Sequence, residues 1–326
     1  MQKDPKVTLV VGGAGYIGSH MVKLMMENGF QVIVLDNLST GHRQLVEAGG
    51  FVQGSLGNAA LLDRVFSKND IGAVMHFAAF SLVGESVRTP LKYYMNNVSE
   101  TLFLIDAMIR HQVKRFIFSS TAAVYGEPEK VPISEAQICR PTNPYGNTKL
   151  AVERMLADCD ASYGLKSICL RYFNAAGAHP SGRLGELHDP ESHLIPLVLK
   201  AALASSPIKI FGNDYPTSDG TCIRDYVHVC DIAQAHLLAL NELEAGGESD
   251  IFNLGNNVGY SVRQVIEIAE KVTGRGIETI ESERREGDPA VLVADSSKIR
   301  RKLGWQPQFE DLETIITTAW RWHRRH

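Results

Sequence analysis

The sequence predicts an α/β protein in which a doubly wound parallel sheet is followed by a smaller, helix-rich C-terminal domain. Through the first half of the chain, short apolar runs of strand length alternate with segments whose apolar residues recur at helical spacing. A glycine-rich turn separates the first of these runs from the first helix. From Asn174 onward the alternation stops, because glycine and proline residues interrupt a long loop.

The first folded stretch, residues 7–36, has the pattern strand, turn, helix, strand. It opens on a β-branched apolar run typical of a strand buried on both faces. After the turn GGAGYIG, Ile17, Met21 and Leu24 recur at helical spacing, and Gly29 ends the predicted helix. A second apolar run then ends at Asp36.

Each part of this stretch suits a dinucleotide. Glycines permit a tight turn and let a pyrophosphate approach the backbone, while the helix start offers unpaired N–H groups. The carboxylate of Asp36 can accept hydrogen bonds from both ribose hydroxyls and would repel a 2′-phosphate, so NAD is favoured over NADP. The alternative is a glycine-rich turn in another α/β protein, but strand, helix and acid together match the fingerprint of the Rossmann fold.

The remaining elements are expected in order along the chain. We expect strands at 51–54, 73–79, 115–120, 167–171, 208–211, 226–229, 251–254 and 277–280, and helices at 59–66, 91–111, 145–163, 193–203 and 231–240, the last with Asp231 as its N-cap. Right-handed crossovers then place helices on both faces of the parallel sheet. We expect a first domain at residues 1–174, to which 221–256 return, and a second domain at 175–326.

Composition limits the classes of function. Of 326 residues, 44% are hydrophobic and 21% charged, and the net charge of −4 gives no strong field for nucleic acid or a membrane surface. No apolar run approaches membrane-spanning length, and the polar first residues do not resemble a secretory signal. Five cysteines without a C-x-x-C pair indicate reduced thiols in the cytoplasm. Because the eleven histidines show no zinc-ligand spacing, we predict no metal site.

Thr121, Tyr145 and Lys149 form the candidate catalytic centre. Thr121 follows a predicted strand, and Tyr145 and Lys149 lie four apart on one face of a predicted helix. A neighbouring ammonium and a nicotinamide cation would lower the pKa of the phenol from about 10, which would make Tyr145 a base near neutral pH. Taken alone, a Tyr–Lys pair at this spacing is usually a surface pair, and residues 119–121 would fit a capped turn.

With these motifs the chain resembles the extended short-chain dehydrogenase/reductase family over residues 7–322. Motifs general to that family are GGAGYIG (12–18), HFAA (76–79), SSTAAVYG (119–126) and YGNTK (145–149). Motifs that match its UDP-hexose 4-epimerase branch are VGESV (83–87), RYFNAAGAHPSG (171–182), IFGNDYPTSDGTCIRDYVHV (210–229) and RREGDPA (284–290).

The resemblance implies reversible epimerisation of UDP-galactose and UDP-glucose at carbon 4, in galactose metabolism. Tyr145 would take the proton of the 4-hydroxyl while hydride passes to bound NAD, and the 4-keto sugar would turn before hydride returns. Residues 1–174 would bind NAD and residues 175–326 mainly the UDP-sugar. Besides the catalytic residues, the implied cofactor contacts are Gly12, Gly15, Tyr16, Ile17, Gly18, Asp36, Asn37, Leu38, Ser55, Leu56, Phe77, Ala78, Ala79, Asn96, Lys149 and Phe173, and the implied substrate contacts are Thr121, Asn174, His193, Leu194, Phe211, Arg224, Arg285 and Asp288.

Six positions depart from the common pattern of the family. Thr121 stands in place of Ser and keeps the hydroxyl. The pair Ser55-Leu56 replaces an Asp-Ile or Asp-Val pair at the adenine, and Ser81 replaces a lysine that reaches the pyrophosphate, so NAD is expected to be held less tightly. His193 replaces an Asn that binds the diphosphate. Leu292 stands where some members have Tyr, and the smaller side chain would admit an N-acetyl group.

Several alternatives remain. A 4,6-dehydratase would need Asp-Glu directly after the Thr, where this chain has Ala122 and Ala123. A 4-epimerase for UDP-N-acetylglucosamine, UDP-glucuronate or a UDP-pentose stays open. A redox sensor without catalysis would usually lose the Tyr145–Lys149 pair, which is retained here. The resemblance also implies a homodimer built from the helices at 91–111 and 145–163.

Overall fold

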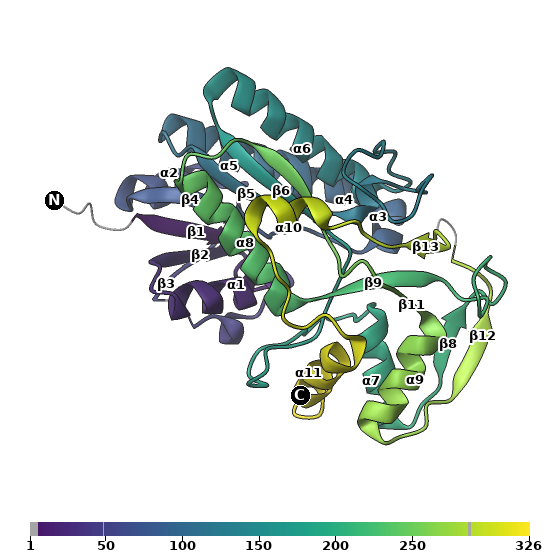
Figure 1. The fold of residues 1–326 in the computed structure, drawn as a ribbon. Coiled ribbons are helices and arrows are strands. Elements are labelled where there is room, and N and C mark those ends of the chain that lie inside the picture. The colour runs from purple at the N-terminus through teal and green to yellow at the C-terminus, as the bar shows by residue number, and fades with distance from the viewer. Residues whose placement is uncertain (1–5, 48, 286–287) are drawn as a thin grey trace. The chain divides into compact units, whose positions relative to one another are not determined.

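A computed structural model describes residues 6–47, 49–285 and 288–326 of the chain (Figure 1). The chain forms two compact units. The first comprises residues 1–125, 139–171 and 233–252, and the second comprises residues 126–138, 172–232 and 253–326. Each unit is described by itself below.

A seven-stranded sheet, in the order β10-β6-β5-β4-β1-β2-β3, forms the framework of the first unit. Strands β3, β2, β1, β4 and β5 pair in parallel with one another in that order. The predicted fold class is therefore confirmed. The strands are β1 (Val7–Val11), β2 (Val32–Asp36), β3 (Gly50–Gln53), β4 (Ile71–His76), β5 (Arg115–Thr121), β6 (Lys166–Tyr172) and β10 (Asp250–Leu254).

The helices of this unit follow the predicted order, except that a helix at Val83–Arg88 was not predicted and the long helix is interrupted in its middle. They are α1 (Tyr16–Glu27), α2 (Ala59–Lys68), α3 (Val83–Arg88), α4 (Pro90–Tyr93), α5 (Glu100–Arg110), α6 (Pro144–Tyr163) and α8 (Val229–Glu244), with short 3₁₀ turns η1 (Arg43–Leu45) and η3 (Ala122–Val124). The helix predicted at 91–111 is interrupted by a π-helical stretch, η2 (Tyr94–Ser99). π-helical stretches are rare in proteins overall, and those that do occur often lie at functional sites.

Apolar strands and helices share one core in this unit. Leu9, Phe116 and Phe118 of the sheet pack with Leu62 of α2 and Leu104 of α5, and all five are at most 1% exposed. Burying each such side chain contributes roughly 1.5–3 kcal/mol. The core therefore holds the carboxyl ends of β1, β4 and β5, which precede the candidate site residues, in fixed positions.

The second unit is built from two small sheets and a group of helices. A four-stranded sheet has the order β11-β9-β13, with β7 paired to β9, and β12 pairs with β8. Helices α7, α9 and α11 contact one another around a second apolar core (Figure 1). The elements are β7 (Asn174–Ala176), α7 (Leu194–Ala204), β8 (Ile208–Phe211), β9 (Ile223–His228), β11 (Gly259–Ser261), α9 (Val262–Thr273), β12 (Thr279–Ser282), β13 (Val291–Leu292), α10 (Ser297–Leu303) and α11 (Leu312–His323).

Local patterns did not predict three of these strands. β7, β11 and β13 have only two or three residues, too few to show an alternating pattern. Within residues 221–256, β10 joins the seven-stranded sheet, whereas β9 belongs to the four-stranded one. That residues 1–174 bind NAD and residues 175–326 bind mainly the UDP-sugar stays a prediction.

Asp231 does not cap its helix as expected. Helix α8 already begins at Val229, and the carboxylate of Asp231 accepts the backbone N–H groups of Gln308 and Phe309, at 2.8 and 3.0 Å. The acid was correctly expected to satisfy backbone donors, but those donors lie far away in the sequence.

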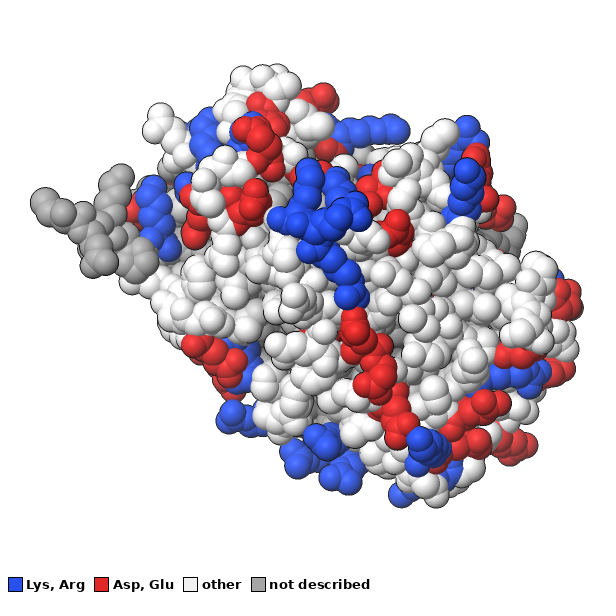
Figure 2. Space-filling model, viewed as in Figure 1, with Lys and Arg blue, Asp and Glu red and all other residues white. Residues whose placement is uncertain are grey.

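The surface agrees with the modest net charge. Figure 2 shows basic and acidic side chains interspersed on the visible face, with a conspicuous basic group over α10, whose last turn carries Arg300, Arg301 and Lys302. No helix among the described residues is both long and apolar enough to cross a bilayer.

Candidate active site

The glycine turn between β1 and α1 is a close backbone contact. At Gly12, φ is +77°, and a Cβ there would lie 2.4 Å from the backbone N of Ala78, while a Cβ at Gly18 would lie 2.1 Å from the Gly12 carbonyl oxygen. The Phe77 N–H donates to the Val11 carbonyl oxygen at 2.8 Å. The turn and the end of β4 are thus brought together, as the predicted cofactor contacts require.

The start of α1 remains open for an anion. Gly15 is the N-cap residue and carries no side chain that could satisfy the first N–H groups of the helix. A Cβ at Gly15 would meet only the Gly12 oxygen, at 3.4 Å. Tyr16 and Ile17 form the first helical turn, with Tyr16 buried and Ile17 partly buried. These N–H groups fit a pyrophosphate.

Asp36 is held in place by two backbone hydrogen bonds. Its Oδ2 accepts the N–H of Ala14 at 2.9 Å, and its Oδ1 accepts the N–H of Leu38 at 2.8 Å. Leu38 adopts φ +59°, an uncommon conformation for a side chain of its kind. Asn37 accepts the Ser39 N–H through its side-chain oxygen. Each oxygen of Asp36 keeps a lone pair for a ribose hydroxyl, so the residues present fit NAD.

The pair Ser55-Leu56 behaves differently from a nucleotide-contacting pair. Leu56 is 6% exposed and packs in the core of the first unit. Ser55 donates its hydroxyl to Glu100 Oε2 at 2.7 Å, and Gly57 N–H donates to the same oxygen at 3.3 Å. Glu100, which the sequence did not suggest, therefore brings a carboxylate to the Ser55 side chain.

The other cofactor candidates lie after β4, in η2 and in the second unit. Phe77, Ala78 and Ala79 directly follow β4, and the Phe77 ring packs against His236 with centroids 4.6 Å apart. Asn96 lies in η2 and donates to Asn97. The buried Asn97 accepts the Phe80 N–H at 2.9 Å and donates to Thr148 at 3.1 Å. It fixes η2 to α6, a role that no local pattern revealed. Phe173 lies in the second unit, 8% exposed.

The three candidate catalytic residues come together between β5 and α6. Lys149 donates from Nζ to the Ser119 carbonyl oxygen at 2.8 Å, and its ammonium lies 4.8 Å from the centroid of the Phe118 ring. Tyr145 and Thr121 are joined by a side-chain hydrogen bond. Thr121 also accepts the Ala123 N–H at 3.1 Å. Asn143 caps α6 by accepting the Gly146 N–H, which fixes the helix start that carries Tyr145.

Burial has the largest effect on the pKa values of Tyr145 and Lys149. Desolvation raises the pKa of Tyr145 to about 12, although the hydrogen bond from Thr121 favours the phenolate. Desolvation lowers the pKa of Lys149 to about 7, although Glu153 favours the ammonium. The expected lowering of the Tyr145 pKa by a protonated Lys149 and a nicotinamide cation together stays a prediction, and the burial of the phenol makes the contribution of the nicotinamide charge necessary.

A buried ion pair supports α6 from beneath and was missed by the sequence analysis. Arg171 binds both carboxylate oxygens of Glu153, the next turn after Lys149, and both side chains are at most 4% exposed. Ser120 donates to the same carboxylate, and Arg171 also donates to Tyr125 at 2.9 Å. The network joins β5, α6 and β6, so it fixes the geometry of the catalytic residues.

Four substrate candidates of the second unit contact one another in pairs, Arg224 with Asp288 and Arg285 with Phe211. Arg224 of β9 lies 3.4 Å from Asp288 and donates to the Ile223 and Pro289 carbonyl oxygens, both at 2.9 Å. The guanidinium of Arg285 lies 4.1 Å from the ring centroid of Phe211. Arg284 pairs with Asp214, not with Asp288. Asn174 begins β7 and hydrogen-bonds the Tyr226 side chain.

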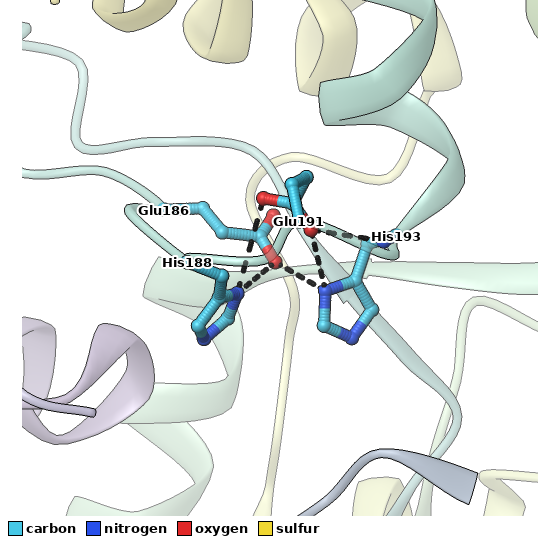
Figure 3. A group of neighbouring side chains, drawn as sticks. All are labelled: Glu186, His188, Glu191 and His193. Carbon is cyan, nitrogen blue, oxygen red and sulfur yellow. Dashed lines mark hydrogen bonds and ion pairs between the residues drawn. The ribbon is translucent and has the colours of Figure 1, made fainter. Parts of the chain in front are cut away.

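His193 and Leu194 lie at the start of α7. His193 is the N-cap residue, yet its ring makes no capping hydrogen bond. Its Nδ1 faces Glu186 Oε1 at 2.7 Å and Glu191 Oε1 at 3.1 Å, beside His188 (Figure 3). The signal for this cluster was present in the sequence as Glu-x-His-x₂-Glu-x-His at 186–193.

Comparison with known proteins gives consistent results over nearly the whole chain. A family model described as "NAD dependent epimerase/dehydratase family" matches residues 8–255. The UDP-glucose 4-epimerase of Halalkalibacterium halodurans is 54% identical over 319 residues, which is 98% of this chain and 96% of that protein.

Solved structures agree. The UDP-glucose 4-epimerase from Brucella ovis, in complex with NAD, is 47% identical with a TM-score of 0.94 and covers 97% of both chains. The UDP-Glc/GlcNAc 4-epimerase from Campylobacter jejuni is 42% identical with a TM-score of 0.86 and covers 98% of this chain and 100% of that chain.

The lowered pKa of Lys149 predicts a pH-dependent stability. Between about pH 7 and the ordinary lysine value of 10.5, the unfolded chain binds more protons at this group than the folded protein. The stability of the wild type should therefore rise with pH in this window, relative to a Lys149→Met variant. We expect the difference to shift by about 3 kcal/mol between pH 7 and pH 10.

Urea unfolding of both proteins at the two pH values measures this shift. Lys149→Leu should give the same pH dependence as Lys149→Met, since both remove the ammonium. A difference between wild type and variants that stays constant with pH would contradict the assignment.

Proposed function

The chain belongs to the NAD dependent epimerase/dehydratase family, and we propose that it interconverts UDP-galactose and UDP-glucose by epimerisation at carbon 4 of the hexose, with NAD as cofactor. The observation that carries the proposal is the hydrogen-bonded pair Thr121 and Tyr145, with the buried Lys149 one helical turn further on. NAD, when bound, would supply a reversible acceptor for the hydride of carbon 4.

The residues of the chain divide the remaining work. Tyr145 removes the proton of the 4-hydroxyl and gives it back when the sugar is reduced. Thr121 hydrogen-bonds Tyr145 and the same substrate oxygen. Lys149, held by the Ser119 carbonyl oxygen, keeps a donor for the nicotinamide ribose and favours the phenolate whenever it is protonated.

The nucleotide ends of both ligands are held by groups of matching charge. We assign the pyrophosphate of NAD to the glycine turn with Tyr16 and Ile17, and its adenosine ribose to Asp36. In the second unit, Arg224 and Arg285 suit the diphosphate of the UDP-sugar because guanidinium groups bind phosphate with forked donors. The Phe211 ring, already covered by Arg285, offers an apolar surface for the uracil.

Replacing Tyr145 by Phe tests the catalytic role. The variant keeps the ring but loses the proton-transfer group, so we expect turnover of UDP-galactose to fall at least about a hundredfold. The measurement is formation of UDP-glucose in a coupled assay. Tyr163→Phe, at the exposed end of the same helix, is the matched control and should retain full activity. An active Tyr145→Phe variant would contradict the mechanism, and an inactive wild type that still binds NAD would favour a redox sensor.

Substrate range is a second proposal that one residue favours. Leu292 lies in β13, in register with Arg224 of β9. Because some family members have Tyr at this position, we propose that the smaller Leu leaves room for a 2-N-acetyl group and that the chain also epimerises UDP-N-acetylglucosamine. The 42% identical C. jejuni enzyme is a UDP-Glc/GlcNAc 4-epimerase by name.

Replacing Leu292 by Tyr tests the substrate range. We expect the variant to lose at least about tenfold in kcat/KM for UDP-N-acetylglucosamine, since filling the space costs 1–3 kcal/mol, and to keep its rate with UDP-galactose. Turnover of UDP-N-acetylglucosamine by the wild type at under about a thousandth of the UDP-glucose rate, roughly 4 kcal/mol of discrimination, would contradict the proposal.

We further propose that the protein is a cytoplasmic homodimer. Apolar side chains project to solvent from the helical region 83–103, which overlaps the predicted dimer helix at 91–111: Leu91, Met95 and Val87 are 77%, 63% and 61% exposed, and Leu102 is 53% exposed. Clustered exposure of this kind marks an interaction surface, and a second copy presents the same face. The free thiols of Cys159, Cys169 and Cys222 suit a reducing compartment.

Charged substitutions test the dimer. The wild type should sediment at twice 35.9 kDa, whereas Leu91→Lys combined with Met95→Lys should shift the protein toward the monomer. Val258→Lys, at an apolar residue 49% exposed outside this region, is the control and should leave the mass unchanged. A wild type that is monomeric at micromolar concentration would rule the proposal out.

A further inference from the structure

Two histidines and two glutamates in the loop before α7 point their polar atoms at one another (Figure 3). They are Glu186, His188, Glu191 and His193, and one ligand atom from each lies within 4.8 Å of the others. We propose that this cluster binds one divalent transition-metal ion, with Zn²⁺ as the best match. The proposal is independent of the epimerase reaction, and it revises the sequence-based expectation of no metal.

The separations around the cluster fit a small ion at its centre. Nδ1 of His188 lies 3.0 Å from Glu186 Oε1 and 3.9 Å from Glu191 Oε2, and Nδ1 of His193 lies 2.7 Å from Glu186 Oε1. A tetrahedral Zn²⁺ with bonds of about 2.0–2.2 Å places its ligands roughly 3.3–3.5 Å apart. The observed values lie on both sides of that range, and no two of the four ligand atoms are more than 4.8 Å apart, so small side-chain movements would close the site.

Glu191 supplies the second, independent observation. Its side chain is 3% exposed, and its Oε1 accepts the backbone N–H groups of Ser192 and His193 at 2.7 and 2.9 Å. Its Oε2 is buried and has no hydrogen-bond partner. A buried carboxylate oxygen without a donor is costly unless a cation meets it. The backbone thus aims this oxygen into the cluster, where a metal would satisfy it.

Charge and donor type select the ion. In the part of the chain that the structure describes, the ion pairs of Glu186 and Glu191 all go to His188 and His193. Two carboxylates balance the charge of a divalent cation when both imidazoles bind it in the neutral form. Mixed nitrogen and oxygen donors favour Zn²⁺ over Mg²⁺ or Ca²⁺.

The role of the ion follows from the number of protein ligands. Four protein ligands leave no open position for a substrate, so the site is structural. The ion would tie the N-cap residue His193 of α7 to Glu186, whose carbonyl oxygen accepts the Trp322 indole N–H of α11 at 2.9 Å. Because the metal takes Nδ1 of His193, Nε2 stays available for the proposed diphosphate contact.

Metal titration of the intact protein tests the site. After treatment with a chelator and desalting, the wild type should take up one equivalent of Zn²⁺ by elemental analysis and should melt at a higher temperature with Zn²⁺ than without it. With Co²⁺ in place of Zn²⁺, it should show the intense visible bands of a tetrahedral ion. A wild type that retains no stoichiometric metal and gives no such bands would overturn the proposal.

Variants locate the metal without an activity assay. Glu191→Gln keeps the size of the side chain and removes its charge, and should weaken Zn²⁺ binding at least about tenfold, with a larger loss for His188→Ala. His179→Ala is the control, since His179 hydrogen-bonds Ser181 outside the cluster. Unchanged Zn²⁺ binding in Glu191→Gln would also overturn the proposal. Should His188→Ala fail to fold by circular dichroism, Glu191→Gln and the wild-type Co²⁺ spectrum decide.

Discussion

The candidate active site depends on one buried cation. Lys149 is 2% exposed, and its ammonium donates to the Ser119 carbonyl oxygen, which ties α6 to the end of β5. This bond places Tyr145, one turn earlier on the helix, beside Thr121 at the strand end. Burying a charge so deeply costs free energy, and this cost lowers the pKa of Lys149. The proposed role of Lys149 in the reaction gives a reason for the fold to retain this destabilising group.

Two neighbouring charged side chains reduce the free-energy cost of burying Lys149. Glu153, four residues further along α6, favours the charged form of Lys149, while Arg171 fixes Glu153 by binding both of its oxygens. Removing one member of such a buried pair typically costs 3–5 kcal/mol, because the remaining charge is left unpaired. Arg171 of β6, Glu153 of α6 and Lys149 of α6 therefore alternate in charge, and each of these side chains stabilises the charged form of its neighbour.

Sequence patterns predicted the parts that depend on neighbours along the chain. Residues 7–36 were interpretable because a strand, a glycine turn and a helix each leave a local signature, and Tyr145 and Lys149 because helical spacing brings them together. Patterns failed where distant segments meet. The partners of Asp231 are 77 and 78 residues away, and Asp288 lies beside Arg224 of a strand that is distant in the sequence. Such outcomes follow from packing, which short windows of sequence do not contain.

The anchoring of Asp36 bears on how coenzyme preference can evolve. Its two oxygens are the acceptors for the N–H groups of Ala14 and Leu38, so the acid is part of the turn as well as the proposed contact to the ribose. Exchanging it for a neutral residue, the obvious first move toward a phosphorylated coenzyme, would strand both donors and loosen the segment that holds Leu38 in its uncommon conformation. A switch of coenzyme in this lineage therefore requires rebuilding a loop, which a single point mutation does not achieve.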